Sequence, residues 1–119
     1  MANEWKRGDV VRVRLDPAEG SEQRGERPGL VISSDEINLH SPVILVASLT
    51  TRKTERVYPF EVLIEAPEGG LHQTSKVMLI HLRGLDKRRI VGHYGSLSAE
   101  TMKQVDAAIG IATGLTLLT

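Results

Sequence analysis

The sequence contains no cysteine and very few aromatic residues. Without cysteine the chain cannot form disulfides, thiolate metal sites, iron–sulfur clusters or a thiol nucleophile, and this composition fits a reducing cytoplasm. One tryptophan, two tyrosines and one phenylalanine are its only aromatic residues. Few aromatic side chains are therefore present on which bases could stack, so we expect a bound nucleic acid to be held mainly by polar and cationic groups.

Long apolar runs and an excess of either charge are also missing. No segment approaches the roughly 20 apolar residues that a membrane span requires, and the polar residues 1–7 lack the core of a signal peptide. We therefore expect a cytoplasmic protein with no membrane partner. Fifteen basic and fifteen acidic residues cancel, which excludes a strongly basic nucleic-acid-coating protein but leaves room for a local basic patch.

The 119 residues, 40% of them apolar and 25% charged, are typical of one soluble globular domain. No repeat, linker or low-complexity tract divides the chain, so we predict a single domain over residues 1–119. A core with so few rings must be built from Val, Ile and Leu. For such a small core, a dimer interface would add stability.

Apolar residues that alternate with polar ones, and short apolar runs, predict a series of β-strands. These are Asp9–Leu15, Arg27–Ser33 (which Arg27-Pro28 opens), Val43–Leu49, Val57–Glu65, Lys76–Leu85 and Ile90–Tyr94. The run Val43–Leu49 is almost continuously apolar and predicts a buried central strand, whereas Pro59 places its strand at a sheet edge or bulge. The polar segments Ala18–Glu26, Ser34–Ser41 and Thr50–Arg56 are predicted as surface loops.

The apolar period changes near the end of the sequence. Ser98 is a predicted helix N-cap and Gly114 a natural stop. Between them, apolar residues recur at three- and four-residue steps: Met102, Val105, Ile109 and Ala112. Gly110 in the helix interior indicates close packing. We therefore predict a mainly β protein, with five or six strands in a curved, mostly antiparallel sheet that one C-terminal helix closes.

Few residues form patterns of known chemistry. The four histidines have no metal-ligand spacing, the glycines match no nucleotide-binding loop, and no Gly-x-Ser-x-Gly elbow is present. We expect no metal and no cofactor. What remains is Arg27 at a loop-to-strand junction, and Thr50 and Thr51 where a buried strand ends. Adjacent strands would bring these residues to one rim of the sheet, where a guanidinium fork matches phosphate oxygens.

Each of these features has a plainer alternative. Arg27 could be a surface arginine in an ion pair with Glu26 or Glu55. Basic residues of two loops, Arg24, Arg52, Lys53 and Arg56, predict a local basic groove, but an ordinary solvated loop would contain the same residues. The residues alone leave both pairs of interpretations open.

Several ordered blocks resemble the MazF/PemK (Kid) toxins of bacterial toxin–antitoxin systems over nearly the whole chain. The blocks are Arg7-Gly8-Asp9-Val10, Asp16-Pro17, Gly20-Ser21-Glu22-Gln23, Arg27-Pro28, Thr50-Thr51, Tyr58-Pro59-Phe60-Glu61-Val62, Leu82-Arg83-Gly84-Leu85-Asp86 and the helix around Val105-Asp106. The resemblance implies a small SH3-like barrel of the CcdB/PemK type and a homodimer. It also implies a metal-independent endoribonuclease that cleaves single-stranded RNA at a short sequence and is neutralised by a MazE-like antitoxin.

The resemblance assigns roles to particular residues. The family's catalytic arginine and threonine correspond to Arg27 and Thr50. Substrate contacts implied by the family, together with the groove residues, are Ser21, Glu22, Gln23, Arg24, Thr51, Arg52, Arg56, Ser75, His81 and Arg83. Several relatives have glutamine in place of His81, so we expect the base preference to differ, because side chains that read base edges tune sequence.

Two other functions are compatible with the same barrel. The CcdB branch poisons DNA gyrase without catalysis, but it uses a tryptophan near the C-terminus, whereas the only tryptophan here is Trp5. A structural or RNA-chaperone barrel is the third interpretation, and it would be favoured if Arg27 and Thr50 lay far apart.

Overall fold

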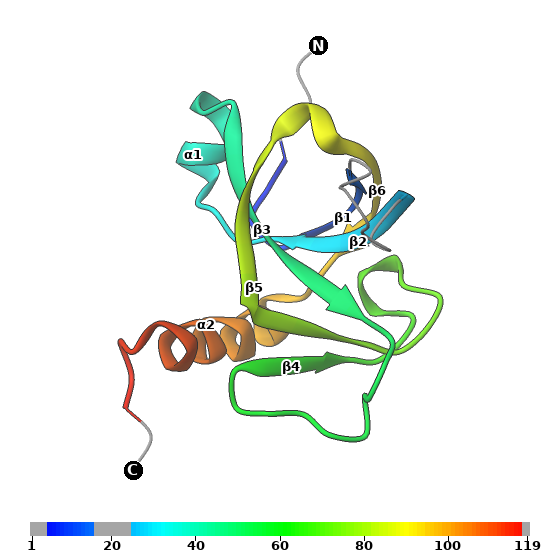
Figure 1. Ribbon diagram of the computed structural model, residues 1–119, viewed down its shortest axis with the longest axis vertical. Helices are drawn as coiled ribbons and strands as arrows, with labels where there is room; N and C mark the ends of the chain where they lie inside the picture. The colour runs from blue at the N-terminus through cyan, green and yellow to red at the C-terminus, as the bar shows by residue number, and fades with distance from the viewer. Residues whose placement is uncertain (1–4, 16–24, 118–119) are drawn as a thin grey trace, which may run out of the picture.

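The computed structural model describes residues 5–15 and 25–117, which form one curled antiparallel sheet and two α-helices (Figure 1). The strands are β1 (Asp9–Leu15), β2 (Gly25–Val31), β3 (Val43–Thr50), β4 (Glu61–Ile64), β5 (Ser75–Asp86) and β6 (Ile90–Ser96). Their order in the sheet is β4-β5-β3-β2-β1-β6, and each strand is antiparallel to its neighbours. The predicted mainly β fold, with β3 in the interior of the sheet and β4 at its edge, is confirmed.

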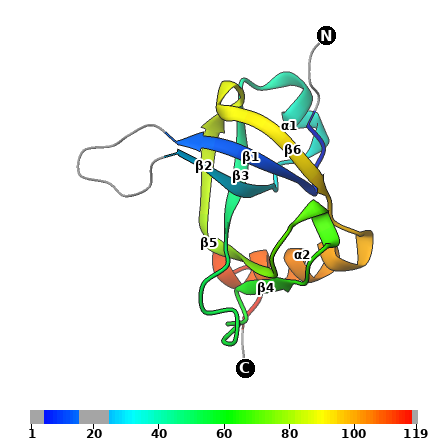
Figure 2. The same cartoon turned by 90° about the vertical axis from the view of Figure 1, so that its right-hand side faces the viewer.

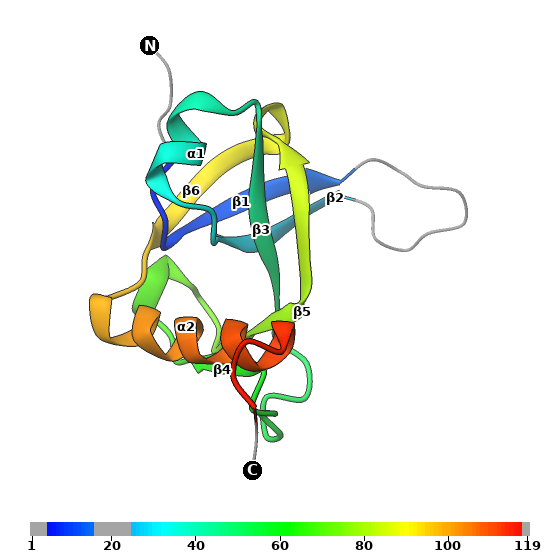
Figure 3. The same cartoon turned by 90° about the vertical axis from the view of Figure 1, so that its left-hand side faces the viewer.

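The helices are α1 (Asp35–His40) and α2 (Ala99–Thr113), and two short 3-10 turns, η1 (Glu68–Gly70) and η2 (Lys87–Arg89), link strands. Figure 3 shows α1 and α2 at opposite ends of the curled sheet. As predicted, the Ser98 side chain caps α2 by accepting a hydrogen bond from the Thr101 N–H, and Gly114 ends the helix. A Cβ on Gly110 would lie 2.6 Å from Thr116 Oγ1, so this glycine does mark close packing. Neither helix is long and apolar enough to cross a membrane within the described residues.

Two hydrophobic clusters hold the sheet. Neighbouring residues of a strand point to opposite faces, so Val10 and Leu30 join one cluster while Val11 and Val31 join the other. The first cluster lies between the sheet and α2 and includes Val105 of the helix. The second fills the concave side formed by β1, β2, β3, the end of β5 and β6. Figure 2 shows how the strands curl around this side. The aliphatic core predicted from the scarcity of rings is therefore divided between two layers.

The segment Ser34–Ser41 was predicted as a loop, and this prediction is wrong because it contains α1. The Ser34 side chain accepts a hydrogen bond from the Ile37 N–H (3.2 Å) and caps the helix. Asn38 is buried, and its side chain donates to the Ser33 carbonyl (3.0 Å). A polar sequence can thus form a short helix with one buried residue when a capping side chain and side-chain hydrogen bonds satisfy its polar groups.

Strand bounds also differ from those predicted. β2 begins at Gly25 rather than at Arg27, because Glu26 and Gly25 pair with the end of β1. The predicted loop Ala18–Glu26 is therefore wrong at Gly25 and Glu26, and its remaining residues lie outside the described ranges. β4 covers only Glu61–Ile64 of the predicted Val57–Glu65, and Pro59, which cannot donate to a ladder, precedes it.

β5 changes register in its middle. Ser48 of β3 lies opposite Met78, whereas the preceding Ala47 lies opposite Leu82. Residues 79–81 of β5 therefore have no partner in β3 and form a bulge. Figure 1 shows β5 bending sharply, so that its first part runs beside β4 and its second part rises beside β3.

Candidate active site

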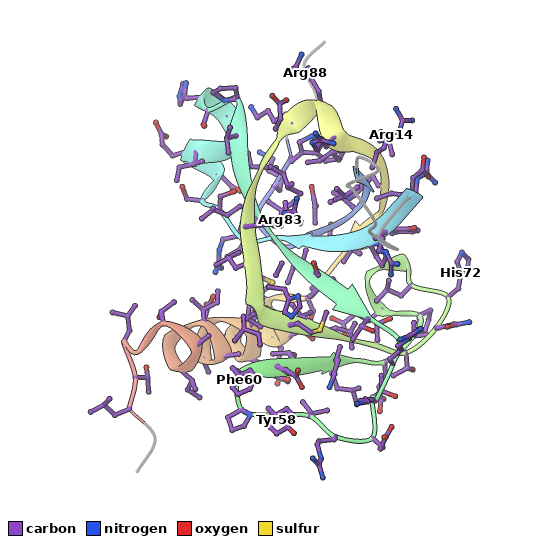
Figure 4. The ribbon with its side chains drawn as sticks, viewed as in Figure 1. Arg14, Tyr58, Phe60, His72, Arg83 and Arg88 are labelled. Atoms are coloured by element: carbon purple, nitrogen blue, oxygen red, sulfur yellow. The ribbon has the colours of Figure 1, made fainter. Side chains whose placement is uncertain are left out.

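A cavity of about 390 Å³ opens where β2, β3 and β5 meet. Six of the residues predicted to bind or cleave a substrate line it: Arg27, Thr50, Thr51, Arg52, His81 and Arg83. Arg83 is labelled on the second part of β5 in Figure 4. The expectation that Arg27 and the threonines meet at one rim of the sheet is consistent with this arrangement.

Strand geometry explains why these side chains converge. Val46, Ser48 and Thr50 are alternate residues of β3, so they share one face, and all three line the cavity. Gly29 of β2 pairs with Ser48. Continuing that antiparallel register by two residues places Arg27 opposite Thr50. The bulge in β5 then brings His81 to the same cavity.

Gly29 keeps the cavity open between these residues. A Cβ at this position would lie 2.5 Å from Val46 Cγ1, which is far closer than atoms pack in proteins. Any larger residue would therefore have to displace Val46, and both positions line the cavity. In the Arg-Pro-Gly sequence at residues 27–29, Arg27 thus supplies a positive charge to the cavity, and Gly29 has no side chain that would fill it.

Arg27 has no partner in the described part of the chain. It is exposed, and neither a hydrogen bond nor an ion pair links it to residues 5–15 or 25–117. Glu26, one of the two acids proposed to neutralise it, instead forms ion pairs with two other arginines, 3.0 Å from Arg12 Nε and 3.8 Å from Arg14 Nη2. Among the residues that the structure describes, nothing therefore occupies the guanidinium donors of Arg27, which suit an anion.

Thr50 is held in place and keeps a donor. Its Oγ1 accepts a hydrogen bond from the Arg52 N–H (3.1 Å). This bond fixes the side chain at the point where β3 ends and leaves the hydroxyl hydrogen free to be donated. A hydroxyl donor and a guanidinium on adjacent strands of one cavity form a suitable cradle for a phosphate group.

A second cavity of about 720 Å³ adjoins the first and shares Thr50, Arg52 and Met78 with it. The predicted basic residues Arg52, Lys53 and Arg56 line it, as do Glu55, Tyr58, Glu61 and Lys76. The hydrogen bond from Arg56 Nη1 to Tyr58 Oη (3.1 Å) raises the pKa of Arg56 above its usual value. The basic groove predicted from the loop sequence is therefore consistent with the second cavity.

The sequence analysis missed a buried ion pair beneath this cavity. Lys76 Nζ lies 2.9 Å from Glu61 Oε1, and each side chain is only 7% exposed. Lys76 also donates to the Arg56 carbonyl (2.8 Å), and Glu61 accepts from the Tyr58 N–H (3.1 Å). The pair therefore ties the loop that carries Arg56 and Tyr58 to β4 and β5. Its only signal in the sequence is opposite charge on two predicted strands.

Not every predicted site residue lies near the cavities. Ser75 is buried, donates a hydrogen bond to the Gln73 carbonyl (2.9 Å) and lines neither cavity. Ser21, Glu22, Gln23 and Arg24 lie outside the described residues. In the part of the chain that the structure describes, no three His, Asp or Glu side chains gather as metal ligands would.

The curled six-stranded half-barrel has a cavity lined by arginine and threonine side chains, which defines a small β-barrel with a cationic face. A family model described as PemK-like, MazF-like toxin of type II toxin–antitoxin system matches residues 6–113. Endoribonuclease MazF of Staphylococcus saprophyticus is 40% identical over 110 residues, which are 92% of each chain. The chain belongs to the PemK-like, MazF-like toxin family, and its enzyme class is endoribonuclease.

Solved structures agree with this assignment. A MazE–MazF structure from Deinococcus radiodurans is 28% identical, with a TM-score of 0.79 over 97% of this chain and 100% of that one. An endoribonuclease in complex with its cognate antitoxin, from a mycobacterial species, is 25% identical, with a TM-score of 0.77 over 95% of this chain and 98% of that one. Both chains are similar to this one in fold along nearly their whole length.

Proposed function

We propose that this chain is the toxin of a toxin–antitoxin pair and cleaves single-stranded RNA at a short sequence without a metal ion. The observation that carries the proposal is that Arg27, without a partner in the described residues, lines one cavity with Thr50. All the relatives reported above are named as MazF toxins or endoribonucleases. We therefore advance this function alone, and not the poisoning of gyrase or a chaperone role.

The proposed reaction needs only the RNA, water and side chains of the cavity. The ribose 2′-hydroxyl gives its proton to water as its oxygen attacks the adjacent phosphorus, and the bond to the 5′-oxygen breaks as water returns a proton to that oxygen. The products are a 2′,3′-cyclic phosphate and a 5′-hydroxyl. The Arg27 fork binds the phosphoryl oxygens and stabilises the charge that builds on them, which supplies the larger part of the catalysis. Thr50 donates its hydroxyl hydrogen to the same phosphate.

Other residues of the two cavities hold the RNA. Arg52, Arg83 and Arg56 provide positive charge for the backbone, and Thr51 adds a hydroxyl. His81 is exposed on the β5 bulge and is placed to read a base edge. On the family resemblance alone, we assign further contacts to residues 21–24. Ser75 is not part of this proposal, because its hydroxyl is already bonded away from the cavities.

We propose a MazE-like antitoxin as the protein partner. Two of the similar structures are titled as complexes with an antitoxin or with MazE. The cationic cavities would suit an acidic segment that folds on binding and blocks RNA entry. The chain would act in the cytoplasm, where RNA is the substrate, as one toxin domain over residues 1–119.

We further propose that two copies of the chain form a homodimer. Four apolar residues of α1 and the beginning of β3 are between 38% and 50% exposed: Ile37, Leu39, Val43 and Leu45. Such a cluster on a small domain is typical of an interface. Sedimentation equilibrium is expected to give twice the chain mass of 13.1 kDa, and Leu39→Glu is expected to shift the protein toward monomer. A monomeric wild-type protein at micromolar concentration would rule the homodimer out.

Cleavage of a long single-stranded RNA tests the function. In buffer with EDTA, the purified protein is expected to cut at a recurring short sequence and to leave 2′,3′-cyclic phosphate and 5′-hydroxyl ends. A 2′-deoxy substitution at the attacking ribose should abolish the cut, and the cognate antitoxin at equimolar concentration should inhibit it. Ends that carry a 5′-phosphate, or cleavage of an all-deoxy strand, would exclude the proposed reaction.

A further inference from the structure

The block Tyr58-Pro59-Phe60-Glu61-Val62 contains two of the chain's four rings, and the proposed reaction gives them no role. Tyr58 and Phe60 are stacked, with ring centroids 5.3 Å apart and an angle of 3° between the planes. Figure 4 shows them next to each other where the chain enters β4. Although Phe60 packs on its ring, Tyr58 remains 42% exposed, and it lines the second cavity.

Tyr58 is held by polar contacts on several sides. Its N–H donates to Glu61 Oε1 (3.1 Å), and its Oη accepts from Arg56 Nη1 (3.1 Å). Arg56 Cζ lies 5.8 Å and Lys76 Nζ 5.9 Å from the ring centroid, within the range of cation–π attraction. A ring fixed in this way loses little conformational entropy when a ligand stacks on it.

The surroundings of Tyr58 favour a nucleotide over an uncharged aromatic ligand. Arg52, Lys53 and Arg56 share its cavity with Glu55, and the charge of Glu61 is balanced by Lys76, so positive charge is in excess. The cavity continues into the first one through Thr50, Arg52 and Met78. An RNA strand with its scissile phosphate at Arg27 and Thr50 would therefore pass directly into a cationic cavity that ends in a half-exposed ring.

We propose that Tyr58 is a stacking platform for one unpaired base that flanks the scissile linkage, while the cations of the second cavity hold the phosphates of that segment. This inference rests on the proposed function, because it places the base relative to a phosphate bound at Arg27. Stacking accepts every base, so Tyr58 contributes affinity and the angle at which the strand enters, and His81 contributes sequence preference.

Binding of a short RNA tests the platform directly. The probe is a single-stranded RNA of about 12 nucleotides centred on the mapped cut site, with one 2′-deoxyribose at the attacking position to prevent cleavage. We expect Tyr58→Ala to raise its Kd about tenfold, the effect of losing one base–aromatic contact. Tyr58→Phe keeps the ring and should bind within about twofold of wild type on the same scale. On cleavable RNA, Tyr58→Ala should raise KM and leave kcat nearly unchanged.

Val57→Ala is the matched control, because Val57 is 41% exposed in the same loop and lines neither cavity. We expect it to bind as wild type does. A series of probes with a single abasic nucleotide then locates the stacked base: one position should weaken wild-type binding and have no effect in Tyr58→Ala. If Tyr58→Ala binds RNA as tightly as wild type does, or every abasic position weakens binding to both proteins equally, the proposed stacking on Tyr58 is wrong. The proposed endoribonuclease function is unaffected by that outcome. If the wild-type protein does not cleave RNA, the proposed function fails and this inference fails with it.

Discussion

Replacing Arg27 with alanine is expected to slow RNA cleavage by about 10²–10³-fold, the usual loss when one donor to a developing oxyanion is removed. The fold should not change, because Arg27 is exposed and has no hydrogen bond or ion pair with described residues. Substitution of such a residue usually changes stability by less than about 0.5 kcal/mol. Single-turnover cleavage rates and thermal unfolding of the same preparations measure the two effects.

Two further variants define what Arg27 contributes. Arg27→Lys keeps the charge but lacks the planar fork, so we expect a rate between those of wild type and Arg27→Ala. Arg14→Ala removes an exposed arginine of the neighbouring strand that forms an ion pair with Glu26 (3.8 Å) and lines neither cavity. It should cleave at nearly the wild-type rate. Undiminished cleavage by Arg27→Ala would show that the reaction does not depend on this guanidinium.

The second large effect is on stability. Lys76→Met is expected to lower the free energy of unfolding by about 3–5 kcal/mol, because it leaves the Glu61 carboxylate buried without its counter-charge. Both side chains are only 7% exposed, so water screens the charge of the unpaired Glu61 carboxylate very little. The variant also removes the hydrogen bond from Lys76 Nζ to the Arg56 carbonyl. Urea denaturation should show a lower midpoint with an unchanged m-value.

A double-variant cycle separates the missing pair from a general defect of packing. If the unpaired carboxylate causes the loss, Lys76→Met combined with Glu61→Leu should be more stable than Lys76→Met alone. The remaining deficit of the double variant reflects the loss of two hydrogen bonds, one from Lys76 Nζ to the Arg56 carbonyl and one from the Tyr58 N–H to Glu61 Oε1. A double variant as unstable as the sum of the two single variants would mean that Lys76 and Glu61 act independently.

Elements with a local signal were predictable from the sequence, and elements that depend on distant contacts were not. Ser98 and Gly114 predict both ends of α2, because capping involves residues within one helical turn. The prediction of a loop at Ser34–Ser41 is wrong because it rests on polar composition. Ser34 is an N-cap, a local signal of the same kind as Ser98, and it indicates a helix. Its buried Asn38 also depends on a bond to Ser33 that composition does not reveal.

The site shows the same division. Arg27 and Thr50 could be related in advance because they end neighbouring predicted strands, and both line the first cavity. The Lys76–Glu61 pair depends on the register between β4 and β5, in which Lys76 lies opposite Leu63 and Glu61 opposite Met78. No periodicity specifies that register. Composition likewise gives the number of Trp, Tyr and Phe residues but not their positions in space. Two of these four residues, Tyr58 and Phe60, stack on each other beside the second cavity.

The bulge in β5 separates residues that maintain the barrel from a residue that faces its surface. Residues 79–81 have no partner in β3, and His81 is exposed at the mouth of the first cavity. An exchange of His81 therefore removes no hydrogen bond from the β3–β5 ladder and opens no hole in the core. A substitution at His81 can therefore change the proposed base contact while the barrel and the Arg27–Thr50 pair stay as they are.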